Sequence, residues 1–215
     1  GFKQLIPLEL LRAPRIQFEI GEGKTSGFVN VHPSLLPLYR GSSPIAYPIL
    51  LGENKTGVTL FVMDEKMDHG PIISQEEMEI TLTDVRSDME KKLTGLGFEM
   101  VKKFINSLTR EPVNSLILKP QLHEQATRAP YMTKDDGFIP LSVLQKALKN
   151  EPLTITELPQ IIRKYLARHP ERKHLQNLLQ NSAITIYNFW RGMSPWPGLW
   201  TLIQPAGKRL KIIDV

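Results

Sequence analysis

Apolar stretches predict three short strands and a short helix in the first part of the chain. Residues 28–32 (FVNVH) and 57–63 (GVTLFVM) are short, mostly apolar stretches bounded by turn residues, which is typical of buried strands. Residues 71–80 alternate apolar and polar side chains, as expected of a strand with one exposed face. Residues 44–51 end at a glycine and predict a short helix between the first two strands.

A long amphipathic helix is predicted after the third strand. From Val85 to Leu108 apolar residues recur at spacings of three and four, and Asp84 is expected to cap the first turn. Such a helix must bury its apolar face, and the predicted strands supply a surface for it. We therefore predict an α/β architecture for residues 1–110, with strands covered by helices.

The second half of the chain begins with a connector and continues with helices and a hairpin. Proline and glycine residues interrupt residues 111–140, and no periodicity survives there. The predicted helices are 141–149, 157–168 and 183–193, and the predicted hairpin strands are 199–203 and 209–215. Because two strands alone are not a stable sheet and the chain opens directly on an apolar segment, we expect a fragment truncated at both ends.

Composition narrows the class of protein. The chain has 215 residues, of which 41% are hydrophobic and 23% charged, which is typical of globular proteins. No long apolar span and no signal-like N-terminus is present, so we expect neither membrane association nor secretion. The absence of cysteine excludes disulfides, thiolate metal sites and a cysteine nucleophile, and five scattered histidines do not suggest zinc. We expect no metal.

Charge is distributed unevenly along the chain. Residues 1–110 carry 13 Lys and Arg against 14 Asp and Glu, net −1, whereas residues 111–215 carry 14 against 8, net +6. A basic second half favours a polyanionic partner, nucleic acid being the commonest. A solvated basic surface is the alternative.

Three polar residues near the predicted strand ends form a chemically coherent set. Asn30 and His32 share one face of the first strand because strand side chains alternate, and Asp68 lies in the turn-like segment 64–70. Each has a structural alternative: Asn30 and His32 could bond neighbouring loops, and Asp68 could be a turn residue. Together they suit acyl transfer by direct attack of a substrate amine, because the set contains a proton carrier, an oxyanion donor and a carboxylate but no good nucleophile.

Short motifs surround these three residues. The motif segments are residues 30–37 (NVHPSLLP), 39–41 (YRG), 56–59 (TGVT), 67–72 (MDHGPI) and 1–7 (GFKQLIP). This set closely resembles the folate-dependent formyltransferase family. The resemblance implies a Rossmann-like formyltransferase domain, here without its N-terminal strands, that uses 10-formyltetrahydrofolate as formyl donor.

The resemblance also implies roles for individual residues. Asn30 and a protonated His32 would stabilise the tetrahedral oxyanion, and Asp68 would hold His32 charged and assist proton removal, so we expect a raised imidazole pKa. The residues implied to contact the folate are Gln4, Leu5, Ile6, Ser34, Leu35, Leu36 and Pro37.

Motifs in the second half distinguish between branches of the family. Residues 127–130 (TRAP), 133–137 (TKDDG) and 194–201 (SPWPGLWT) are similar to the linker and C-terminal domain entry of the methionyl-tRNA formyltransferase branch. This implies initiator methionyl-tRNA as partner and the start of a small β-barrel. Sugar-amine formyltransferases share residues 39–41 and are the nearest alternative. The candidate tRNA-binding residues are Arg40, Lys208, Arg209 and Lys211, although the last three could be edge-strand charges.

We therefore expect a catalytic part over 1–110, a linker over 111–140, and helices with the start of a tRNA-binding domain over 141–215. Trp196 and Trp200 are expected to pack in the core or between domains, not to stack on bases. We expect a monomer in a bacterial-type cytoplasm, with the mitochondrial matrix as alternative. A truncated, non-catalytic RNA-binding fragment is the competing hypothesis.

Overall fold

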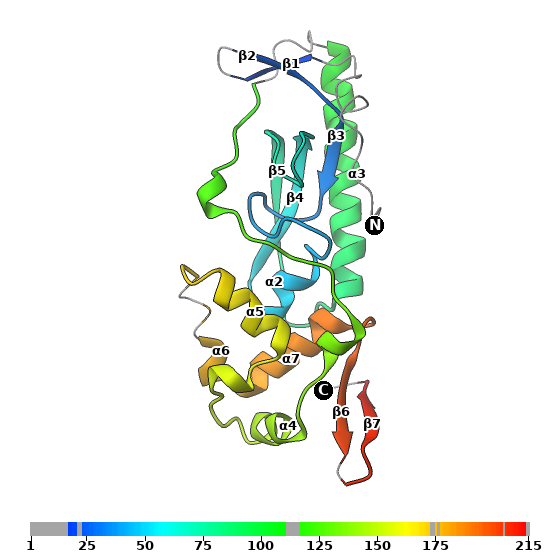
Figure 1. Cartoon of the computed structure of the whole chain (residues 1–215). Coiled ribbons are helices and arrows are strands. Elements are labelled where there is room, and N and C mark those ends of the chain that lie inside the picture. The colour runs from blue at the N-terminus through cyan, green and yellow to red at the C-terminus, as the bar shows by residue number, and fades with distance from the viewer. Residues whose placement is uncertain are drawn as a thin grey trace. The chain divides into compact units, whose positions relative to one another are not determined.

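The computed structural model describes residues 17–20, 23–110, 117–172, 175, 177–203 and 205–213 (Figure 1). The chain forms two compact units. The first unit comprises residues 1–44, 55–79 and 90–130, and the second comprises residues 45–54, 80–89 and 131–215. Both units therefore draw on the first half of the chain.

The first unit is built on a three-stranded sheet. Its strands are β3 (Val29–His32), β4 (Lys55–Val62) and β5 (Ile72–Glu79), in the order β3-β4-β5. All neighbours are antiparallel, and the register shifts between Leu60 and Phe61 on β4. The three strands predicted from the apolar stretches are confirmed to within two residues at each end. A further antiparallel pair, β1 (Gln17–Ile20) and β2 (Gly23–Ser26), was not predicted.

Helix α3 (Arg86–Arg110) follows one face of this sheet (Figure 1). Its Gly97 lies so close to the strands that an added Cβ would be 3.0 Å from Val31 Cγ1 and 3.6 Å from Val58 Cγ1. Leu93 and Met100, one turn to either side, are each 2% exposed. The period of three to four residues thus buries one stripe of α3 from residue 90 onward, as expected.

The predicted cap of α3 is wrong. Asp84 uses its Oδ2 to accept bonds from Thr81 N and Thr81 Oγ1, at 2.9 and 2.8 Å. The first turn is instead closed by Asp88, whose Oδ2 accepts from Val85 N at 3.3 Å. A carboxylate just before a helix can accept hydrogen bonds from the first turn of the helix or from the turn that precedes it. Here Asp84 accepts from the preceding turn.

The second unit is helical around α7 (Ser182–Met193). In α7, Gly192 lies against α2 (Ala46–Leu50), since an added Cβ would be 2.6 Å from Leu50 Cδ2. The buried Arg191 of α7 donates to the carbonyl oxygens of Thr81 and Asp84, at 2.7 and 2.8 Å. Among the residues that the structure describes, this unit also contains α4 (Leu141–Leu148), α5 (Gln160–Arg168) and α6 (Asn177–Gln180), with the 3-10 turns η3 (Lys134–Gly137) and η4 (Ile155–Glu157). The 3-10 turn η2 (His123–Gln125) belongs to the first unit.

The second unit ends in the antiparallel hairpin β6 (Leu199–Ile203) and β7 (Lys208–Ile212). Trp200 of β6 packs on Phe138, with ring centroids 4.8 Å apart, and its Nε1 donates to Lys134 O at 2.9 Å. Trp200 is therefore a packing residue, as expected. Trp196 is 37% exposed and contacts Tyr131 at 5.9 Å between ring centroids. None of the helices in the described part of the chain has the length and apolar character of a membrane span.

Candidate active site

Strand β3 carries two polar side chains to one face of the sheet. Asn30 pairs with Phe61, and His32 pairs with Thr59, across the β3–β4 ladder. Both lie on the face opposite Val31, which contacts α3. Asn30 is half-buried and His32 is 5% exposed. The alternation along the strand thus brings an amide and an imidazole to one face, as predicted.

Asp68 reaches this face from the turn between β4 and β5. Its Oδ2 lies 3.7 Å from His32 Nδ1, which is ion-pair range but beyond hydrogen-bond distance. The same oxygen accepts the backbone N–H of Gly41 at 2.7 Å. Asp68 has φ +50°, a left-handed conformation that is uncommon for residues other than glycine. Because the strands are antiparallel, the carboxylate meets the imidazole through this turn and not through a neighbouring parallel strand end.

Burial sets the protonation of His32. It lowers the pKa of the imidazole below its usual 6.5, and the opposing effects of Asp68 and of the bond to Tyr39 O are smaller. This is the opposite of the expected direction, because desolvation outweighs the nearby carboxylate. Nε2 lies 3.2 Å from Tyr39 O, and since a carbonyl only accepts, the Nε2–H tautomer satisfies this contact. Nδ1 is then the basic nitrogen, and it faces Asp68.

Residues 34–37 form a loop that several hydrogen bonds hold in place. Thr59 Oγ1 donates to Ser34 O at 2.6 Å and accepts from Leu36 N at 3.1 Å. Gln75 Nε2 donates to Leu36 O at 2.6 Å, and Ser34 Oγ donates to Leu38 O at 2.7 Å. These bonds fix the loop against the sheet.

Of the four loop residues that were expected to contact the folate, two are buried and two are partly exposed. Ser34 is fully buried, and Leu36 packs in a core cluster with Phe61 and Ile72. Leu35 and Pro37 are only half-buried. Leu35 and Pro37 are therefore the two side chains of this loop that remain accessible to a ligand.

A segment remote in sequence closes the loop after Tyr39. Thr127 accepts the N–H of Tyr39 on Oγ1 at 2.8 Å and the N–H of Arg40 on its carbonyl at 2.9 Å. Ala129 N donates to Arg40 O at 2.7 Å. Gly41 has φ +116°, and an added Cβ would be 2.8 Å from Ala129 O, so this position requires glycine. The TRAP motif therefore holds the YRG motif in place.

Arg40, an expected tRNA contact, is bonded within the protein. Its Nε and Nη2 donate to Gln121 Oε1, and Nη2 lies 2.9 Å from His123 Nδ1. Partial desolvation, and then the nearby His69 and Arg40, lower the pKa of the exposed His123, which leaves Nδ1 able to accept this bond. His123 stacks on His69 with ring centroids 3.8 Å apart, and His69 Nδ1 is 2.6 Å from Asp64 Oδ2.

Gln121 and His123 are two residues of this site that were not predicted from the sequence. Both lie in the connector, where prolines remove any periodicity and no motif points to chemistry. Glutamine is rarely a chemical candidate, and a lone histidine is weak evidence. No local sequence pattern would have identified Gln121.

The basic residues of β7 do not share a face. Arg209 and Lys211 lie on the face of Trp200, whereas Lys208 alternates to the other face. The guanidinium of Arg209 lies 3.7 Å from the centroid of the Trp200 ring, a cation–π contact. Only part of this expected tRNA-binding set can therefore meet a ligand from one side.

The remaining expected residues, Gln4, Leu5 and Ile6, lie outside the described part of the chain. Among the described residues, histidine, aspartate and glutamate form no group of three or more that could hold a metal ion.

The fold and these motifs define a class of protein. The family model "Formyl transferase" matches residues 1–105, and "Formyl transferase, C-terminal domain" matches residues 177–215. The chain belongs to the formyl transferase family. It is similar to the methionyl-tRNA formyltransferase of Alkaliphilus oremlandii, with 30% identity over 99% of this chain and 51% of the relative. The corresponding protein of Kosmotoga olearia is 44% identical over 53% of this chain and 35% of the relative.

Solved structures support the fold assignment. The 4-N formyltransferase from Francisella tularensis aligns with a TM-score of 0.64 at 21% identity, over 98% of this chain and 66% of that one. The N-formyltransferase from Helicobacter canadensis, solved with folinic acid and dTDP-3-aminofucose, gives 0.54 at 20% identity, over 82% and 51% of the two chains. The predicted α/β formyltransferase fold is confirmed. The chain spans about half the length of the curated relative that it matches from end to end.

Proposed function

We propose that the protein transfers the formyl group of 10-formyltetrahydrofolate to the amino group of initiator methionyl-tRNA. The observation that carries this proposal is the ion-pair contact between His32 and Asp68, at 3.7 Å, on the face that also presents Asn30. The similarity to methionyl-tRNA formyltransferases over 99% of the chain supports the choice of acceptor.

The chemistry follows from the three side chains. The methionyl amine attacks the formyl carbon, and the Asn30 amide donates to the oxyanion that develops. His32, neutral at physiological pH because of its burial, accepts the amine proton on Nδ1. Asp68 stabilises the resulting imidazolium. His32 then returns the proton to the departing folate nitrogen as the carbon–nitrogen bond breaks, which leaves formylmethionyl-tRNA and tetrahydrofolate.

Formyl-transfer kinetics test this assignment in the protein as its gene encodes it, with charged initiator tRNA. His32→Ala and Asp68→Asn are each expected to lower kcat by about 10²–10⁴-fold, as for loss of a proton-transfer group, with little change in the Kd for tRNA. Gln145→Glu, on the exposed face of α4, serves as the charge control. Unchanged turnover in either site variant contradicts the assigned role.

A nucleotide-sugar amine is the alternative acceptor. Three of the solved structures that share this fold are named as sugar formyltransferases or bind an amino-sugar nucleotide. Activity on such a sugar without tRNA would favour that alternative. Absence of both activities, with RNA binding retained, would favour a non-catalytic RNA-binding protein.

We further propose a bacterial-type cytoplasm as the site of action, because the similar methionyl-tRNA formyltransferases are bacterial. Fractionation of cells that express the tagged natural protein tests this. Recovery with mitochondria would favour the matrix instead.

A further inference from the structure

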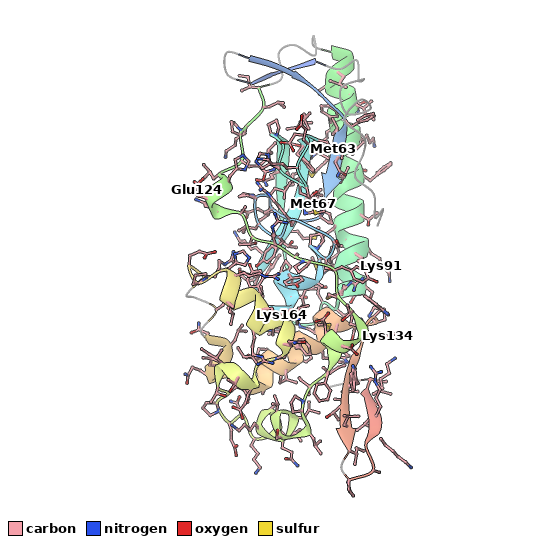
Figure 2. All side chains as sticks on the ribbon, in the orientation of Figure 1. Met63, Met67, Lys91, Glu124, Lys134 and Lys164 are labelled. Atoms are coloured by element: carbon pink, nitrogen blue, oxygen red, sulfur yellow. The ribbon has the colours of Figure 1, made fainter. Side chains whose placement is uncertain are left out.

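Gln121 binds two separate parts of the candidate active site. Its side-chain Nε2 donates to Asp68 O at 3.1 Å and to Gly70 O at 2.7 Å. Its Oε1 accepts from the guanidinium of Arg40. The residue is 5% exposed, so these bonds compete little with water. One amide thus joins the Asp68 turn to the YRG loop. Figure 2 labels Met67, which precedes Asp68, and Glu124, which lies three residues after Gln121.

The turn that Gln121 holds is strained and tightly packed. Asp68 has φ +50° without being glycine, and at Gly70 an added Cβ would be 1.8 Å from Val62 O. A left-handed residue of this kind persists only where the surroundings hold it from several sides. Gln121 bonds the carbonyls of residues 68 and 70, and Gly41 N bonds the Asp68 carboxylate at 2.7 Å.

We propose that Gln121 is a positioning residue for the reaction: it holds the Asp68 turn in the conformation that presents the Asp68 carboxylate to His32. The inference rests on the proposed function for its kinetic consequence, but its structural content does not depend on the acceptor. Gln121 acts through Asp68 and contacts no reacting group itself.

A role limited to anchoring its own segment does not account for these contacts. On one side of Gln121, Lys119 exchanges two backbone bonds with Ile72, both at 2.8 Å. On the other side, Thr127 and Ala129 bond the backbone of Arg40. The segment 119–129 is therefore fixed at both ends by backbone bonds that do not involve the Gln121 side chain. The side-chain amide of Gln121 instead bonds the Asp68 turn.

The chemistry of the amide suggests the test. Glutamate has the same shape as glutamine and keeps an acceptor for Arg40, but it cannot donate to the carbonyls of Asp68 and Gly70. Gln121→Glu therefore removes the positioning bonds selectively. Gln121→Met removes them without adding charge. Gln125→Glu, with an exposed side chain four residues along, is the matched control.

The first experiment measures formyl transfer in the protein as its gene encodes it. Gln121→Glu and Gln121→Met are expected to lower kcat about 10- to 100-fold, less than the loss of a proton-transfer group itself, with KM for both substrates within twofold. In a double variant with Asp68→Asn, either Gln121 change is expected to lower the single-turnover rate constant by less than a further twofold. The reason is that both substitutions act through the same carboxylate. Losses that multiply in the double variant, or that appear equally in Gln125→Glu, overturn the proposal.

The second experiment needs no turnover. The His32 imidazole is followed by NMR titration, assigned by the signal lost in His32→Ala. Asp68 raises the pKa of His32, so Gln121→Met, which adds no charge, is expected to lower that pKa further, with the signals of the folded protein retained. An unchanged His32 pKa in folded Gln121→Met overturns the positioning role. If the wild type fails to formylate methionyl-tRNA while the pKa shift is observed, the proposed acceptor is wrong and the positioning role stands.

Discussion

The two faces of the β3–β4–β5 sheet are made by alternate residues of the same strands, yet they are stabilised differently. The face toward α3 presents Val31 and Val58 to a helix glycine, a regular apolar contact. The opposite face carries His32 and Thr59 under loops that are held by buried hydrogen bonds and by left-handed residues. Apolar packing tolerates adjustment, whereas buried polar groups must meet specific partners. The difference explains why the second face can fix the position of chemical groups.

The largest effect on stability is expected from the α3 face. Leu93→Ala removes a side chain that is 2% exposed and should lower the free energy of unfolding by about 2–5 kcal/mol, through lost burial and the cavity left behind. Denaturant unfolding measures this. Phe98→Ala on the same helix, 66% exposed, is the control and should cost about 0.5 kcal/mol or less. Equal losses of unfolding free energy in the two variants would show that the buried apolar residues of α3 do not stabilise its packing on the sheet.

The next effect compares one substitution on the two faces. Thr59→Val leaves Ser34 O and Leu36 N without their partner, and should lower the free energy of unfolding by about 1–3 kcal/mol. Thr56, on the α3 face of the same strand, is 4% exposed and its hydroxyl has no hydrogen-bond partner among the described residues. Thr56→Val should therefore be neutral or stabilising. The comparison fails if both variants shift the denaturation midpoint in the same direction by the same amount.

A smaller effect is expected from pH. Burial lowers the pKa of His32 in the folded state, so between that value and 6.5 the unfolded state binds more protons. Stability should then fall as the pH drops through about 6.5, by at most about 1.4 kcal/mol per pH unit from this residue. His32→Gln removes this contribution. Unfolding measured at pH 7.5 and 5.5 checks it, and a wild type that gains stability relative to His32→Gln on acidification contradicts it.

The smallest effect is expected at an exposed ion pair between α3 and β5. Lys103 Nζ lies 2.9 Å from Glu76 Oε1, but both side chains are exposed and screened by salt. Lys103→Met should shift Tm little at physiological ionic strength, and any shift should shrink in high salt. A salt-independent loss as large as that of Thr59→Val would contradict the assignment of this contact as a weak, screened surface ion pair.

Much of the first unit was predictable because the responsible interactions are local or periodic. The strands followed from apolar runs, α3 from its spacing of three and four, and the shared face of Asn30 and His32 from strand alternation. The cap at Asp84 failed because two neighbouring sets of donors compete for one carboxylate. The antiparallel order was not predicted, since pairing depends on strands that meet only in the folded chain.

The amino-acid sequence alone determined most of the elements, although not the β1–β2 pair, together with the family resemblance and the choice of His32 and Asp68 as chemical groups. The tertiary structure decided how they meet: a turn in a left-handed conformation, a burial that lowers the imidazole pKa, and Gln121 arriving from 53 residues beyond Asp68. Desolvation and long-range hydrogen bonds depend on which atoms surround a group after folding. No local pattern of residue types encodes those surroundings.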